Sequence, residues 1–289
     1  MIGDIYINRV DIYKLYGMWV VEDGYNEFVE WPCFKPISFI DWPESDGIDP
    51  DLAEPKLAPR EFSLRIASYK SWGNGIGAFC NDMRAARGVA SIDAVAIKRT
   101  CIARFKGVTR ITTARGITYA DIIFTENIPV QNEGAIITEL AYNDDYTIDG
   151  RPFSFLNTRI LEGSLSSITG EYRTKPVMEV DAADTDGVIL GAPLLTFEPY
   201  NATLRCLMTA SSLDVLWSNY DALCSRMTAP ETRYIWVKNT LMKYKCYYVS
   251  QRVVRFLPTP KPWIEFDITV NVFSSPYSAT APIDNDNIQ

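Results

Sequence analysis

The clearest pattern along this chain is a strict alternation of hydrophobic and polar residues in several short segments. The alternation is most regular in residues 263–273. There the hydrophobic positions are Ile264, Phe266, Ile268, Val270 and Val272, and the polar ones are Glu265, Asp267, Thr269 and Asn271. A period of two predicts an antiparallel strand with one buried face. Shorter alternations around Leu64 and Leu204 predict two more strands.

Two segments show helical spacing instead. Their hydrophobic residues recur three or four positions apart, which places them on one stripe of an α-helix. The stripes are Ile76, Phe79, Cys80, Met83 and Ala86, and then Leu213, Leu216, Trp217, Tyr220, Leu223, Cys224 and Met227. We expect the buried helix faces to be formed by Phe79, Met83, Leu216, Trp217 and Tyr220. Ser211 and Asp214 have the spacing of a capping box at the start of the second helix.

Hydrophobic runs predict the remaining strands. They lie at residues 5–21, 92–97, 100–111 and 118–128, and at 146–161, 234–237 and 241–256. The run from Lys243 to Tyr248 interleaves lysines with aromatic residues, as some nucleic-acid-binding sheets do. On an alternating strand, however, Tyr244, Cys246 and Tyr248 share one face and the lysines share the other. We therefore interpret this run as a core strand.

Several short sequences in this chain occur twice. Lys35-Pro36-Ile37 returns as Lys175-Pro176-Val177, Asp46-Gly47-Ile48 as Asp186-Gly187-Val188, and Leu64-Arg65 as Leu204-Arg205, each 140 positions later. Leu52-x-x-Pro55-x-Leu57 returns as Leu190-x-x-Pro193-x-Leu195, 138 positions later. Matching blocks in the same order predict an internal duplication.

Each half of the chain is thus expected to contain a strand region, an extended arm, a strand, a helix and three more strands. Because the helix interrupts the strands rather than alternating with them, the pattern predicts an α+β class with mostly antiparallel sheets. We expect two tandem copies of one β-sandwich or barrel-like domain, with boundaries at 1–142 and 143–289. The transition falls at the acidic sequence Asn143-Asp144-Asp145.

The segment between residues 25 and 60 is rich in proline and aromatic residues. Because proline removes strand hydrogen-bond donors, we expect an extended arm with one short strand at 37–41. Trp31, Phe34 and Trp42 lie on this arm. Exposed aromatic residues there would predict contact with another subunit; the alternative is that they pack on their own domain.

Composition narrows the possible functions. The chain of 289 residues has a net charge of −8 and no histidine, and 47% of its residues are hydrophobic. The negative charge argues against a surface that binds nucleic acid. Because the chain has no histidine, it cannot use an imidazole side chain as a general base. The longest hydrophobic runs are too short for a membrane helix, and the N-terminus does not resemble a secretion signal. The six cysteines form no C-x-x-C pair and suit buried positions.

Candidate chemical motifs are weak. Gly73-x-Gly75-x-Gly77 lies between a strand and a helix, but it lacks dinucleotide-loop spacing and the second half has no glycine there. Asp184 and Asp186 do not fit the register of a calcium loop. We therefore expect no enzymatic activity, no catalytic residues, no cofactor and no metal site.

The order of elements in each half resembles the tail-tube domain of long-tailed bacteriophages, which also builds distal tail and baseplate hub proteins. The Lys-Pro, Asp-Gly and Leu-x-x-Pro segments resemble tail components of phages and prophages of Bacteroides-type hosts. This resemblance implies a virion tail protein that assembles in the host cytoplasm.

The family resemblance also implies how such a protein works. Sheets of neighbouring domains would join into a channel that DNA traverses without specific binding, while helices cover the outside. Arms at 25–59 and 163–199 would lock subunits together, with Trp31, Phe34 and Trp42 as inter-subunit contacts. The implied partners are further copies of the chain, a trimer in preference to a hexamer, and other tail or baseplate proteins, with no membrane. A host-surface or carbohydrate-binding module is the alternative, suggested by Trp31 and Trp42.

Overall fold

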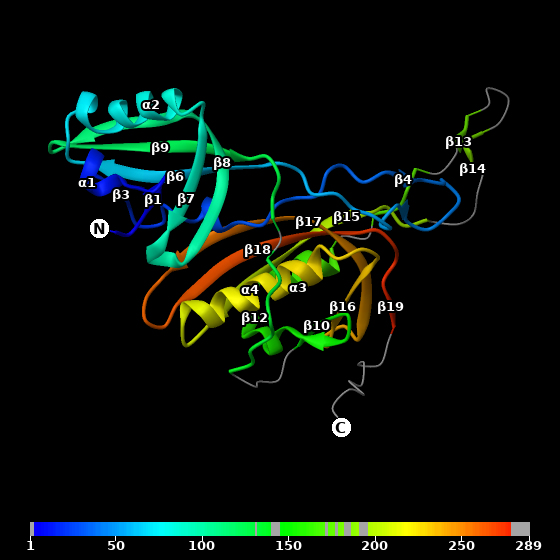
Figure 1. Cartoon of the computed structure of the whole chain (residues 1–289). Coiled ribbons are helices and arrows are strands. Elements are labelled where there is room, and N and C mark those ends of the chain that lie inside the picture. The colour runs from blue at the N-terminus through cyan, green and yellow to red at the C-terminus, as the bar shows by residue number, and fades with distance from the viewer. Residues whose placement is uncertain are drawn as a thin grey trace.

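The computed structural model describes residues 3–130, 132–139, 145–170, 173–176, 179–181, 186–190 and 196–278. These residues form two large antiparallel sheets, one from each half of the chain (Figure 1). The predicted transition at Asn143 and Asp144 lies outside the described residues. The predicted α+β class with mostly antiparallel strands is confirmed.

The first sheet contains seven strands. Their spatial order is β2 (Val10–Asp11), β1 (Tyr6–Ile7), β7 (Val89–Ala94), β8 (Arg99–Ala114), β9 (Ile117–Glu126), β6 (Arg60–Ser68) and β3 (Met18–Val20). The helices of this half are α1 (Ile12–Tyr16) and α2 (Ile76–Ala85), with 3-10 turns η1 (Glu27–Val29), η2 (Trp72–Asn74) and η3 (Val95–Ile97). Figure 1 shows α2 covering one face of this sheet.

The second sheet has the corresponding order. It runs β11 (Arg151–Pro152), β10 (Tyr146–Ile148), β16 (Arg233–Val237), β17 (Met242–Leu257), β18 (Trp263–Val272), β15 (Tyr200–Thr209) and β12 (Thr158–Ile160), and β19 (Tyr277–Ser278) pairs with β17. Its helices are α3 (Ser164–Thr169) and α4 (Leu213–Met227), with η4 (Phe153–Leu156). Each half also carries a two-stranded ribbon, β4 (Phe39–Ile40) with β5 (Asp49–Pro50) and β13 (Glu179–Val180) with β14 (Ile189–Leu190).

Irregular features recur at matching places in the two sheets. β8 shifts register between Phe105 and Gly107, and β17 does so between Tyr248 and Ser250, 143 positions later. Both ribbons have the same register, with Phe39 opposite Pro50 in one and Glu179 opposite Leu190 in the other. The two sheets therefore share their strand order and these irregularities.

The core lies between each sheet and its helix. β18 alternates buried and half-buried residues along its whole length, which confirms the predicted one-face-buried strand. Tyr244, Cys246 and Tyr248 are at most 2% exposed, so the interpretation of residues 243–248 as a core strand is also confirmed. The flanking lysines on β17 are half-buried.

The predicted strand at residues 5–21 is wrong in its middle. The Asp11 side chain accepts hydrogen bonds from the N–H groups of Tyr13 and Lys14 and so caps α1. Gly17 then ends this helix in the left-handed conformation, with φ of 64°. The segment therefore contains three short strands and one short helix in place of a continuous strand.

Three other boundaries differ from the predictions. The cap of α4 is Ser212, whose hydroxyl accepts a hydrogen bond from the N–H of Val215, and not Ser211. The predicted strand at 92–97 ends at Ala94 and continues as η3. The short strand predicted at 37–41 is paired with β5, so the tip of the arm is a ribbon.

Candidate functional site

The arm of the first half leaves its own sheet and runs along the second sheet (Figure 1). On the way, Trp31 inserts into the second half and becomes 95% buried, with 5% of its surface exposed. Its ring centroid lies 5.0 Å from that of Tyr220 on α4, 6.2 Å from Tyr248 on β17 and 5.7 Å from Phe266 on β18. One residue of the first half therefore completes the aromatic core of the second.

Polar contacts fix the backbone beside Trp31. Its N–H donates to Oε1 of Gln251 at 2.9 Å, and the N–H of Val253 donates to Oε1 of Glu30 at 2.9 Å. Burial raises the pKa of Glu30 to about 7, against the lowering effect of the Val253 N–H. The arm is therefore held by side-chain-to-backbone hydrogen bonds in both directions.

Two tyrosine hydroxyls of the second half also bind the arm. Tyr220 donates to the carbonyl of Val29, and Tyr248 donates to the carbonyl of Pro32, each at 3.0 Å. Both tyrosines are at most 1% exposed, and burial raises the pKa of each phenol well above its usual value. Each hydroxyl stays protonated and can act as a donor throughout the physiological pH range.

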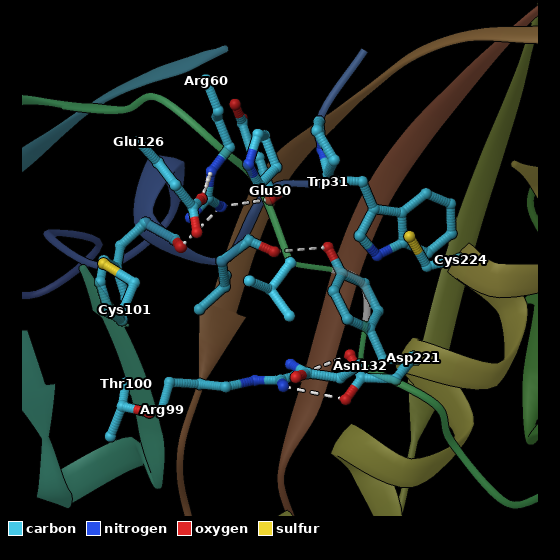
Figure 2. A pocket seen from close by; sticks show the side chains of 16 residues that line it. Glu30, Trp31, Arg60, Arg99, Thr100, Cys101, Glu126, Asn132, Asp221 and Cys224 are labelled. Atoms are coloured by element: carbon cyan, nitrogen blue, oxygen red, sulfur yellow. Dashed lines mark hydrogen bonds and ion pairs between the residues drawn. The ribbon is translucent and has the colours of Figure 1, made fainter. Parts of the chain in front are cut away.

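A small polar cavity of about 80 Å³ lies where the arm passes between the halves (Figure 2). Two ion pairs line it: Arg60 with Glu126 at 2.8 Å within the first half, and Arg99 with Asp221 at 2.6 Å between the halves. The Arg99 guanidinium also lies 4.2 Å from the ring centroid of Trp217. Burial raises the pKa of Asp221, and hydrogen bonding to Arg99 opposes this rise.

The cavity also contains two cysteines, Cys101 and Cys224. Burial raises the pKa of each thiol to about 12, so both are protonated at neutral pH and are poor nucleophiles. Within the described part of the chain, no cluster of three or more His, Cys, Asp or Glu side chains could hold a metal ion. The arrangement joins two sheets rather than activating a reactive group.

A second contact fixes the tip of the arm. The side chain of Lys175, in the second half, is 6% exposed. Its Nζ donates to the Asp41 carboxylate at 2.6 Å and to the carbonyls of Trp42 and Ser45 at 2.9 and 3.0 Å. Asp46 accepts a hydrogen bond from the N–H of Phe197 at 2.8 Å. One buried lysine thus organises the loop between β4 and β5.

The structure separates the three aromatic residues predicted on the arm. Trp31 is buried, because the second half supplies an aromatic pocket for it. Phe34 is half-buried with its ring centroid 5.5 Å from that of Tyr248. Trp42 is 61% exposed. Whether Trp42 contacts another subunit stays a prediction.

The residues predicted for the helix faces lie in the two cores. Phe79, Met83, Leu216, Trp217 and Tyr220 are between 0% and 5% exposed. Trp217 has an additional contact, since its Nε1–H donates to the carbonyl of Ile97 in the first half at 2.6 Å. Sequence reasoning missed Arg99, Asp221 and Lys175, because no local periodicity marks a pairing across more than 100 positions.

Comparisons with known proteins give little further information. No protein-family model matches the chain, and no curated protein matches it. Among solved structures, the Dit protein (gp 19.1) of SPP1, described as a paradigm of the hub adsorption apparatus in phages that infect Gram-positive bacteria, aligns with a TM-score of 0.33 and 9% identity. The alignment covers 93% of this chain and 97% of that one. A TM-score this low does not establish a common fold. No helix among the described residues is long and apolar enough to span a membrane.

Proposed function

We propose that this chain is a non-enzymatic structural component of a phage tail or a phage-like injection tail, in the tail tube or in a distal tail or baseplate hub ring. Its two sheets are tandem copies of one tail-tube-like domain, and strands of both copies line a channel that DNA traverses without specific binding. The sequence resemblance and the matching strand orders support this proposal.

One observation carries the proposal: the arm of the first half is buried in the second half of the same chain. The donor surface and the acceptor surface are different, so the contact is head-to-tail. A head-to-tail contact between equivalent domains can repeat around an axis until a ring closes. This is how a tail ring would be built, and a solitary binding module has no need of it.

We propose a trimer, in which six domains form a pseudo-sixfold ring. Both halves keep the same sheet order, which favours equivalent positions around the channel. Other tail proteins would bind the two faces of the ring. The Lys-Pro and Asp-Gly segments are the basis for proposing a Bacteroides-type host.

Native mass measurement and negative-stain imaging of the purified chain test this function. We expect particles of about three times 32.7 kDa with a central channel. About six times that mass would instead support a hexameric collar, with one copy per chain at the channel. A stable monomer with no ring at any concentration would refute the structural role.

A further inference from the structure

The arm of the first half contacts the second half in two places. Each of these places on the second half has a counterpart on the first half. Lys175 is the repeat of Lys35, and each follows an isolated β-bridge at the same place in its arm, Phe34 with Leu57 and Thr174 with Phe197. The N–H of Lys35 donates to the Lys56 carbonyl at 2.8 Å, and the N–H of Lys175 donates to the Thr196 carbonyl at 2.9 Å. Their side chains differ, because Lys175 is buried by the first arm whereas Lys35 is exposed.

The arm of the second half contains counterparts of the residues of the first arm that surround Lys175. Asp41, which pairs with Lys175, corresponds to Asp181 at a shift of 140 positions. The Asp46-Gly47 turn corresponds to Asp186-Gly187, and both glycines have positive φ, 72° and 81°. The ribbon of β13 and β14 that carries this turn projects away from both sheets (Figure 1). Asp181 is exposed.

The second counterpart is the surface that receives Trp31. The matched register shifts of β8 and β17 place Phe105 where Tyr248 lies and Val108 where Gln251 lies. In the second half the arm covers this surface. In the first half the same region, between α2 and β8, is an open groove of about 720 Å³ lined by side chains that include Trp72 and Ile111.

We propose that the arm of the second half docks on the first half of another copy of this chain. This contact between chains repeats the contact that the arm of the first half makes within one chain. Asp181 of one copy pairs with Lys35 of the next, and Thr174 of that arm, the counterpart of Phe34, lies at the groove beside Phe105. This docking deepens the proposed ring and rests on it. Each chain then offers one arm and receives one.

The chemistry of the two surfaces favours this occupant. The intrachain pair of Lys175 and Asp41 shows that a lysine at this position is satisfied by one carboxylate and two or more carbonyls from a ribbon loop. A second copy carries the same aspartate on the same kind of ribbon. Because the groove also contains Arg84 and Arg87, it suits an acidic chain with a net charge of −8.

A charge exchange tests the pairing directly. We expect Lys35→Glu and Asp181→Lys each to weaken association of the full chain by about 30-fold or more, measured by native mass over a concentration series. The double variant should recover most of this loss, because it restores opposite charges. Lys56→Glu is the matched control, since Lys56 is exposed beside Lys35 and pairs with Glu54; it should associate like the parent.

Filling the groove gives an independent test. A Cβ added at Gly107 meets no atom within 4 Å, so Gly107→Trp should fold with an unchanged melting temperature and block the second arm. Rings that persist in Gly107→Trp, or in both charge variants, would overturn this docking and leave the proposed ring intact. A double variant that stays dissociated would overturn the Lys35–Asp181 pairing. A parent protein that is monomeric at all concentrations would refute both the docking and the ring.

Discussion

Replacing Trp31 is the sharpest test of how the two halves are joined. A buried tryptophan removes roughly 150–250 Å² from water, worth about 4–6 kcal/mol at about 25 cal/mol per Å². Trp31 is 5% exposed and packs against three aromatic rings, so nearly all of this burial is realised. We expect Trp31→Ala to lower the free energy of unfolding by about 3–5 kcal/mol.

A milder substitution should separate packing from hydrogen bonding. The indole Nε1 of Trp31 is buried and has no hydrogen-bond partner among the described residues. Trp31→Phe removes this unsatisfied donor while keeping a ring in the pocket, so we expect less than half the loss seen for alanine. The exposed Trp42 provides the control, and Trp42→Ala should stay within about 0.5 kcal/mol of the parent.

Urea unfolding followed by far-UV circular dichroism measures these differences, and limited proteolysis reports release of the arm. We expect Trp31→Ala to unfold at lower urea and to be cut within residues 22–34 well before the parent. If Trp31→Ala unfolds like Trp42→Ala and its arm resists protease like the parent arm, the arm does not join the halves as described.

Three further results are expected. Arg99→Ala should destabilise the protein by about 3–5 kcal/mol in thermal or urea unfolding, because it leaves Asp221 buried without its partner; an effect below about 1 kcal/mol would contradict this. The folded pKa of Glu30, about 7, lies above its value in the unfolded chain, so stability should fall as pH rises from about 4.5 to 7, by up to about 3 kcal/mol. Glu30→Gln should flatten that part of the pH–stability curve, and an unchanged slope would exclude Glu30 as its source. Phe79→Asp and Leu216→Asp should each unfold or aggregate the protein, since an unpaired carboxylate in either core costs several kcal/mol; a parent-like melting curve for either would contradict the assigned core.

The structure changes the expected role of the arm in folding. On sequence alone, deletion of residues 24–42 would leave the second half folded and remove only contacts between chains. The deletion also removes Trp31, which fills the core of the second half, and Asp41, which pairs with the buried Lys175. Loss of assembly in such a variant would therefore not distinguish a missing contact from a damaged core, and point substitutions are the better test.

Hydrophobic periodicity in the sequence by itself determined several elements of this protein. The alternation in residues 263–273 predicts β18 because a half-buried strand needs a hydrophobic residue at every second position. The stripes around Phe79 and Leu216 predict α2 and α4 for the corresponding reason at helical spacing. Both patterns are local, so the sequence of one segment is enough to predict the element that it forms.

Only the tertiary structure decided where the arm goes and which residues join the halves. Trp31 is buried because Tyr220, Tyr248 and Phe266 are brought together about 190 to 235 positions away, and a proline-rich segment has no period that points to them. The pairing of Arg99 with Asp221 is likewise not indicated by any local sequence pattern. Lys35 and Lys175 lie in the same three-residue motif, yet one is exposed and the other is buried. That difference depends on which arm reaches each lysine, and this is set by chain connectivity and packing rather than by local sequence.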